Sequence, residues 1–232
     1  MRHRDRDKSS PQRPAQKARA KVLIVDDSAV AREGLAAIIG RDIRFALCGS
    51  VPDARSANEL LEKEKPDILV IEPFLANCDG IFLIKDLAGR FQGMRILAIS
   101  KQPEEVYAER VLRAGASGYW MKNGSAEELI HAIETVLAGE LYVSARVALL
   151  AVHKLVDRPL PNGSRVDGLT DRELHVFALV GAGFGTARIA KELGLSPRTI
   201  ETYHEHIKLK LGYANAEALH RGAREWFAPG QS

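Results

Sequence analysis

Residues 20–140 alternate between short apolar runs and stretches with helical spacing of apolar side chains. Each apolar run is short enough for a buried strand, and each is followed by a pattern typical of an amphipathic helix. The strand-like runs are VLIVDD (22–27), RFALCGS (44–50), DILVIE (67–72), RILAIS (95–100) and SGYWMK (117–122). The helical stretches lie around 35–39, around 60–61, and at about 80–90, 104–113 and 126–137. This alternation predicts an α/β doubly wound domain with a five-stranded parallel sheet and helices on both faces.

The pattern changes after residue 166, where only helical signals follow. Thr170 and Glu173 have the spacing of a capping box, which marks the start of a helix. A second short helix ends at Gly194, and Ser196 with Pro197 begins a third. The spacing predicts a small all-α helix-turn-helix domain.

The third helix of this domain, Ser196–Leu211, has one narrow apolar stripe. Ile200, Ile207 and Leu211 fall on one side, and Arg198, Glu201, Thr202 and Glu205 fall on the other. A short helix with a polar, hydrogen-bonding outer face suits the major groove of DNA. On pattern alone, any small helical bundle remains an equal alternative.

The segments LTDREL and IAKELGLSPRTIETYHEHIKLKLG, followed by Glu217–Trp226, resemble the LuxR-type helix-turn-helix of NarL/FixJ-family response regulators. The resemblance implies binding to double-stranded DNA. It places Glu201, Thr202 and Glu205 toward bases, and it places Arg198, Thr199, Lys208 and Lys210 nearer phosphates. It also implies that a fourth helix, about Asn215–Phe227, pairs two copies into a homodimer through Leu219, Trp226 and Phe227.

Polar side chains lie at the carboxyl ends of the predicted strands. They are Asp26, Asp27, Glu72, Ser100 and Lys122, and in a parallel sheet such groups converge at one edge. The segments VLIVDDS, AIS and GASGYWMK, with the region of Glu72, resemble the receiver domain of two-component response regulators. The resemblance implies a possible, weak Mg²⁺ site at Asp26 and Asp27 and no required cofactor. It also implies phosphoryl contacts from Ser100 and Lys122, and a switch aromatic at Tyr119.

One position departs from the receiver pattern. The family's phospho-accepting aspartate is replaced by Glu72, with Pro73 directly after it and Ala76 in place of the usual loop proline. The extra methylene moves the carboxylate by about 1.5 Å, a displacement that can slow an in-line reaction by roughly 10²-fold. We therefore expect a phosphorylation-independent transcription regulator without enzymatic activity, and the departure argues against a histidine kinase as partner. The alternatives are a conventional phosphorylation switch and a protein-interaction module that does not bind DNA.

These patterns divide the chain into four parts. We expect a disordered basic tail (1–19), a receiver-like domain (20–140), a linker that includes a helix (141–166) and the helix-turn-helix domain (167–228). The net charge of +3 is concentrated in the tail, which carries +5, whereas residues 165–232 carry only +1. One DNA module alone should therefore bind phosphates weakly. The two cysteines and the lack of a long apolar run predict a cytoplasmic protein with no membrane partner.

Overall fold

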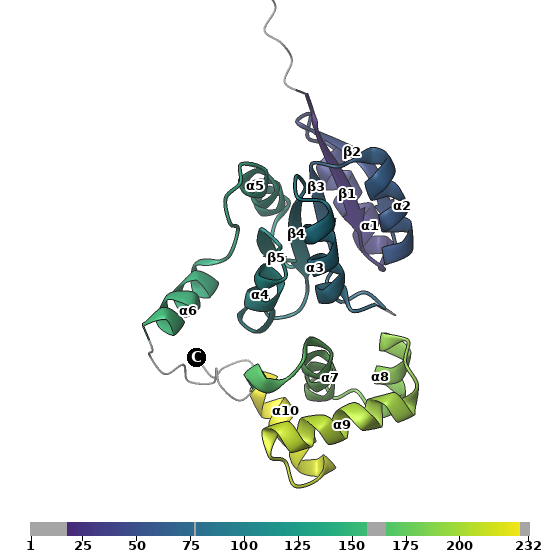
Figure 1. The fold of residues 1–232 in the computed structure, drawn as a ribbon, viewed down its shortest axis with the longest axis vertical. Helices are drawn as coiled ribbons and strands as arrows, with labels where there is room; N and C mark the ends of the chain where they lie inside the picture. The colour runs from purple at the N-terminus through teal and green to yellow at the C-terminus, as the bar shows by residue number, and fades with distance from the viewer. Residues whose placement is uncertain (1–17, 77, 157–165, 228–232) are drawn as a thin grey trace, which may run out of the picture.

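The computed structural model describes residues 18–76, 78–156 and 166–227, so most of the predicted tail and residues 157–165 of the linker lie outside it. A five-stranded parallel sheet forms the first half of the molecule, with strand order β2-β1-β3-β4-β5 (Figure 1). The strands are β1 (Ala20–Val25), β2 (Phe45–Val51), β3 (Ile68–Ile71), β4 (Arg95–Ser100) and β5 (Gly118–Met121). This arrangement confirms the predicted α/β doubly wound fold.

Helices cover both faces of the sheet. They are α1 (Ala29–Gly40), α2 (Ala54–Glu64), α3 (Gly80–Arg90), α4 (Glu104–Arg113) and α5 (Ala126–Leu137). Side chains of α1 and α5 pack with Val22 and Ile24 of β1, whereas α2, α3 and α4 pack with Leu23 and Val25. Alternate residues of one strand thus face opposite layers, as period-two side-chain geometry requires.

The second half is all helical, which confirms the other predicted domain (Figure 1). It contains the turn η1 (Val166–Gly168) and the helices α7 (Asp171–Gly181), α8 (Thr186–Leu193), α9 (Pro197–Leu211) and α10 (Ala216–Phe227). The Thr170–Glu173 capping box is present, and Ser196 caps α9 with Pro197 in its first turn. Gly194 and Gly212 end α8 and α9 with positive φ angles, which glycine adopts without a steric penalty.

Between the two halves, the chain first follows the free edge of β5. Tyr119 N–H donates to Tyr142 O (2.9 Å), and Tyr142 N–H donates to Ser117 O (3.0 Å). This segment covers an edge that would otherwise expose unpaired backbone groups. It leads into α6 (Ala145–Leu155), the helix predicted within the linker, which packs against α4.

Helix α7 is enclosed on all sides. Every residue from Glu173 to Val180 is buried, although one face of a surface helix normally stays exposed. On one side α7 packs with α9 and α10, and on the other it meets the sheet domain. The apolar cores of the two domains form one continuous cluster through this contact.

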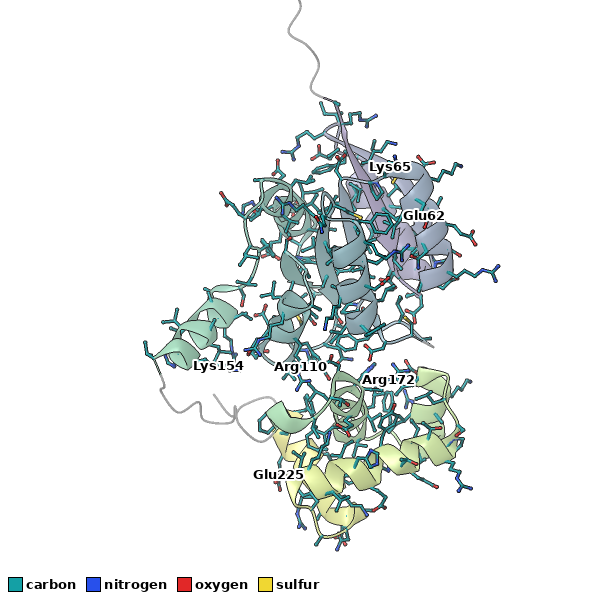
Figure 2. All side chains as sticks on the ribbon, in the orientation of Figure 1. Glu62, Lys65, Arg110, Lys154, Arg172 and Glu225 are labelled. Carbon is teal, nitrogen blue, oxygen red and sulfur yellow. The ribbon has the colours of Figure 1, made fainter. Side chains whose placement is uncertain are left out.

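Two arginines connect the domains (Figure 2). Arg110 of α4 donates to the carbonyl oxygens of Leu169 (2.8 Å) and Val166 (3.1 Å) and to the Asp171 carboxylate (2.7 Å). Arg172 of α7 reaches back to Cys78 O (3.2 Å). Each guanidinium thus donates charge-assisted hydrogen bonds to acceptors of the partner domain.

We expect Arg110→Ala to weaken the contact between the domains, because three acceptors lose a charged donor. Hydrogen bonds to charged groups typically contribute about 1.5–3 kcal/mol each. The loss should lower the midpoint of thermal unfolding and increase hydrogen exchange in α7. The matched control is Arg113→Ala, in the same helix, whose exposed side chain pairs with Glu109 and should change stability by less than about 1 kcal/mol. Equal losses in both variants would contradict a docking role for Arg110.

Candidate functional sites: an acidic pocket and a recognition helix

A buried lysine joins two carboxylates at the carboxyl edge of the sheet. The Lys122 ammonium lies 2.5 Å from Asp26 Oδ2 and 2.7 Å from Glu72 Oε2. Asp26 follows β1 and Glu72 follows β3, and these adjacent strands are where the strand order reverses. This is the point at which open α/β sheets place their sites.

Backbone amides fix the carboxylates of the pocket. Ser28 N–H donates to Asp26 Oδ1 (2.9 Å), and Phe74 N–H donates to Glu72 Oε1 (3.0 Å). Asp27 is different, because its side chain is exposed and accepts from Ala76 N–H at 2.9 Å. It therefore ties the β1–α1 loop to the β3–α3 loop at the rim of the pocket.

The other two predicted pocket residues lie beside this charge cluster and are buried. Ser100, at the end of β4, is 1% exposed, and its hydroxyl accepts from Gln102 N–H (3.2 Å). Tyr119 is also 1% exposed, and its hydroxyl donates to Gln102 O (2.9 Å). The structure thus brings together Asp26, Glu72, Ser100, Tyr119 and Lys122 and leaves Asp27 at the rim.

Burial sets the electrostatics of the pocket. It raises the pKa of Glu72, and the Lys122 ammonium and the Phe74 amide offset this only in part. Burial works against the charged form of Lys122, but the carboxylates of Glu72 and Asp26 outweigh it and raise the pKa of the amine. Lys122 therefore stays protonated and serves as the counter-ion that holds both acids.

The Mg²⁺ site expected at Asp26 and Asp27 stays a prediction, because both carboxylates are held here by donors of the chain itself. A magnesium site needs several oxygen ligands in octahedral geometry. Asp26 points to the Lys122 ammonium, and Asp27 points to the Ala76 amide. Within the part of the chain that the structure describes, no group of three acidic, histidine or cysteine side chains could hold a metal ion.

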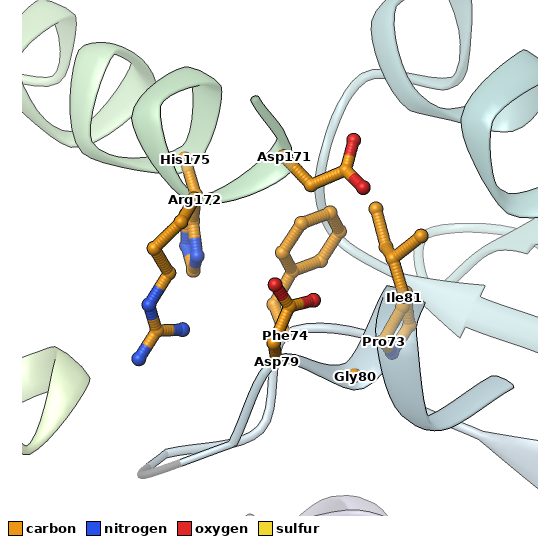
Figure 3. A pocket seen from close by; sticks show the side chains of 8 residues that line it. All are labelled: Pro73, Phe74, Asp79, Gly80, Ile81, Asp171, Arg172 and His175. Carbon is orange, nitrogen blue, oxygen red and sulfur yellow. The ribbon is translucent and has the colours of Figure 1, made fainter. Parts of the chain in front are cut away.

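The pocket is linked to α7 through Phe74. Its amide is held by Glu72, and its ring packs edge-on against His175 (4.7 Å between centroids) and Tyr107 (4.6 Å). Figure 3 shows Phe74 reaching from the loop after β3 to α7, beside a cleft of about 10 Å³, room for roughly one water. Burial and the charge of Arg172 lower the pKa of His175 to about 4, so its imidazole is neutral at pH 7.

The backbone after β3 is tightly packed. A Cβ atom on Gly80 would lie 2.2 Å from Pro73 O, so only glycine allows α3 to begin this close to the loop. Asp79 caps the same helix by accepting from Phe82 N–H (3.1 Å). Pro73, directly before Phe74, is therefore packed against the first residue of α3.

Helix α9 presents most of its predicted polar face to solvent. Ile200 and Ile207 are buried as predicted, and Leu211 is half-buried. Arg198, Glu201, Thr202 and Glu205 are exposed, and Thr199 is half-buried. Their exposure is the geometry that the prediction of base and phosphate contacts requires.

The two lysines of α9 are engaged within the domain. Lys208 pairs with Glu205 (2.8 Å), and Lys210 pairs with the buried carboxylate of Glu173 (2.6 Å). His206 Nδ1 lies 3.7 Å from that same carboxylate. Lys210 thus neutralises a buried acid of the capping box, a role that the sequence analysis missed.

The prediction that Leu219 is available for pairing is wrong, because its side chain is fully buried inside the domain. Phe227 is half-buried, with its ring 5.9 Å from that of Phe177, and Trp226 is half-buried as well. The apolar side of α10 therefore packs against its own α7. Its amphipathic pattern could not distinguish a core contact from a dimer contact.

The sequence analysis also missed the residues that join the two sites, Phe74, Arg110, Arg172 and His175. One signal was available: α7 reads LHVFALV and is apolar on nearly all sides, as in a helix buried between two partners. Which receiver residues cover it depends on the tertiary arrangement.

Comparison with known proteins agrees with this architecture. Residues 22–134 match the response regulator receiver domain, and residues 167–223 match the bacterial regulatory proteins of the luxR family. Oxygen regulatory protein NreC of Staphylococcus aureus is 31% identical over 204 residues, covering 86% of this chain and 94% of NreC. The chain thus belongs to the NarL/FixJ family of two-component response regulators, which are transcription regulators.

Solved structures show the same fold. A LuxR-family two-component response regulator from Aurantimonas sp. SI85-9A1 is 31% identical, with a TM-score of 0.55, covering 60% of this chain and 99% of that one. RcsB of Salmonella typhimurium is 22% identical, with a TM-score of 0.65, covering 90% of this chain and 98% of that one. Among the described residues, no helix is long and apolar enough to cross a membrane.

The raised pKa of Glu72 predicts a specific pH dependence of stability. As pH falls from 8 toward 5, the folded chain takes up a proton at Glu72 before the unfolded chain does, which favours the folded state. Glu72→Gln should therefore be more stable than the parent at pH 8, and the difference should shrink as pH falls through the folded-state pKa. Urea unfolding at both pH values tests this, with Glu59→Gln on the exposed side of α2 as a control that should show no such change. A Gln variant less stable at pH 8 would mean that pairing with Lys122 outweighs burial.

Proposed function

We propose that this chain is a dimeric, DNA-binding transcription regulator whose receiver acts without being phosphorylated. The observation that carries the proposal is the Lys122 ammonium 2.7 Å from Glu72. Glu72 stands at the end of β3, where the family resemblance places the acceptor aspartate. Its carboxylate pairs directly with the Lys122 ammonium, and this pairing needs no phosphoryl group.

The geometry also disfavours phosphoryl transfer. Glu72 uses one carboxylate oxygen for Lys122 and the other for the Phe74 amide, so neither oxygen is left without a strong donor. Phosphoryl transfer depends on positioning an acceptor oxygen and on cations around it. Lys122 supplies a cation, but both oxygens of Glu72 are already held by donors, so the proposal has no step for a histidine kinase.

The exposed recognition helix supports DNA binding in the docked arrangement. Helix α7 lies between the receiver and α9, so the outer face of α9 points away from the receiver (Figure 1). Arg198, Glu201 and Thr202 are exposed while the domains remain packed together. Access to DNA therefore does not require the receiver to be displaced.

Charge explains why two copies should bind together. Residues 165–232 carry a net charge of +1, and Lys208 and Lys210 are each paired with an acid. A weakly charged module releases few counter-ions from DNA and binds weakly alone. Two modules on half-sites about 34–36 Å apart would combine their affinities.

We expect Arg198→Ala to weaken binding to all sequences alike and to reduce the salt slope by about 1, because one phosphate contact is lost. Glu205→Ala should instead change the preferred base at one position, since a carboxylate can accept from cytosine N4. Selection from a random DNA pool, followed by binding measurements at several salt concentrations, tests both. Arg55→Ala, the same charge change on the exposed side of α2, is the control and should bind as the parent does. If Arg198→Ala and Glu205→Ala also bind every probe as the parent does, α9 is not the recognition helix that contacts DNA.

We expect no stable acyl phosphate on the parent chain after incubation with acetyl phosphate and Mg²⁺, and DNA affinity should stay within about twofold. Mass spectrometry and a DNA-binding titration on the same sample measure both. If Glu72→Asp becomes phosphorylated, the added methylene of Glu72 is what prevents phosphorylation of the parent. If Glu72→Asp is not phosphorylated, Pro73 and Ala76 are the residues that prevent it. A phosphorylated parent with a matching gain in affinity would replace the proposal with the conventional switch. A chain that shifts no DNA at any salt concentration would favour the interaction module.

A further inference from the structure

Helix α6 has an apolar side that is open to solvent. Leu149, Val152 and Val156 are 56%, 52% and 57% exposed, and Leu141 just before the helix is 67% exposed. Ala145, also exposed, recurs at helical spacing with Leu149, Val152 and Val156, and these four form one stripe, called here the α6 stripe. Large side chains exposed together in this way mark an interaction surface more often than a passive one.

The charged residues of α6 make this side unusual. Arg146 pairs with Glu105 (3.0 Å) and Lys154 pairs with Glu109, and both acids belong to α4. Figure 2 shows Lys154 on α6 near α4. Val147 of α6 is buried against the receiver core. The helix thus directs its permanent charges toward its own receiver and its apolar residues toward water, the reverse of a surface helix without a partner.

We propose that the α6 stripe is a dimer interface that binds the α6 stripe of a second copy of this chain in antiparallel orientation. A two-fold axis near residues 150 and 151 would place Leu149 opposite Val152 of the second copy, and Ala145 opposite Val156. Leu149 and Val152 then pack at the centre of the interface, and Ala145 faces Val156 at each end, as in the isologous contact of a two-fold dimer. His153 borders the stripe and would lie at its rim.

The apolar character of the α6 stripe favours a second copy of the chain as the partner. The central positions Leu149, Val152 and Val156 carry no charge or hydrogen-bonding group, so a complementary surface must be uncharged and apolar. The stripe itself is such a surface, and antiparallel pairing is self-complementary. The area belongs to the small, weak class of interfaces, below about 1,200 Å², so association should be reversible in the micromolar range.

The choice of a second copy rests on the proposed function, in which two DNA modules act together. Helix α6 lies between the receiver and the chain that leads to the recognition module. Pairing there would tether two modules and raise the effective concentration of the second at its half-site. A weak interface suffices, because DNA supplies the remaining affinity.

The test is sedimentation velocity of the full chain without DNA, from about 1 to 200 µM. We expect the parent to shift from monomer to dimer over this range. Leu149→Glu and Leu149→Lys should each remain monomeric, because like charges meet near the two-fold axis, and an equimolar mixture of the two should dimerise again. Ile43→Glu is the matched control, since Ile43 is 82% exposed on the receiver and the variant should dimerise as the parent does.

Each other outcome overturns the inference. A parent that stays monomeric at 200 µM, a dimer that survives Leu149→Glu, or a mixture that does not recover would exclude the antiparallel α6 pair. Circular dichroism confirms that each variant is folded, and the exposure of Leu149 makes both substitutions compatible with the fold. DNA binding is titrated separately: a chain with no DNA affinity would contradict the proposed function, whereas DNA-bound dimers of Leu149→Glu equal to those of the parent would contradict only the α6 interface.

Discussion

The buried ammonium of Lys122 is the interaction on which the carboxyl edge of the sheet depends. Asp26 and Glu72 follow neighbouring strands and are almost inaccessible to water, and two carboxylates this close together in a buried site are costly without a counter-ion. Lys122 supplies it from the end of β5. Three segments distant in sequence are thereby held at one point, and the loop after β3 takes its position from there.

The loop after β3 connects the pocket to helix α7. Because Glu72 also binds the Phe74 amide, the ring of Phe74 is presented to Tyr107 and to His175 of α7. A neutral His175 can pack in this apolar contact without a buried charge. The charge balance of the pocket and the seating of the DNA module are therefore parts of one packed structure.

The sequence was sufficient for the fold because its signals are local. Strand ends with acids, the Thr170–Glu173 capping box and the Ile200–Ile207 spacing each depend on a few neighbouring residues, and the structure places them as predicted. Pairing between residues far apart in sequence was not accessible in the same way. The direction of Asp27, the partner of Lys210 and the burial of Leu219 all depend on which elements meet, and helical periodicity alone cannot distinguish a core face from an interface.

The enclosure of α7 limits the modularity of this protein. Leu174 and Phe177 of this helix pack in the core of the DNA module. Arg172 and His175 of the same helix contact the receiver. A chimera that joins this module to another receiver would need equivalents of Phe74 and Arg110, or it would leave a polar and aromatic surface without its counterpart. Exchange of domains between relatives is thus restricted by side chains that lie in neither the phosphoryl pocket nor the recognition helix.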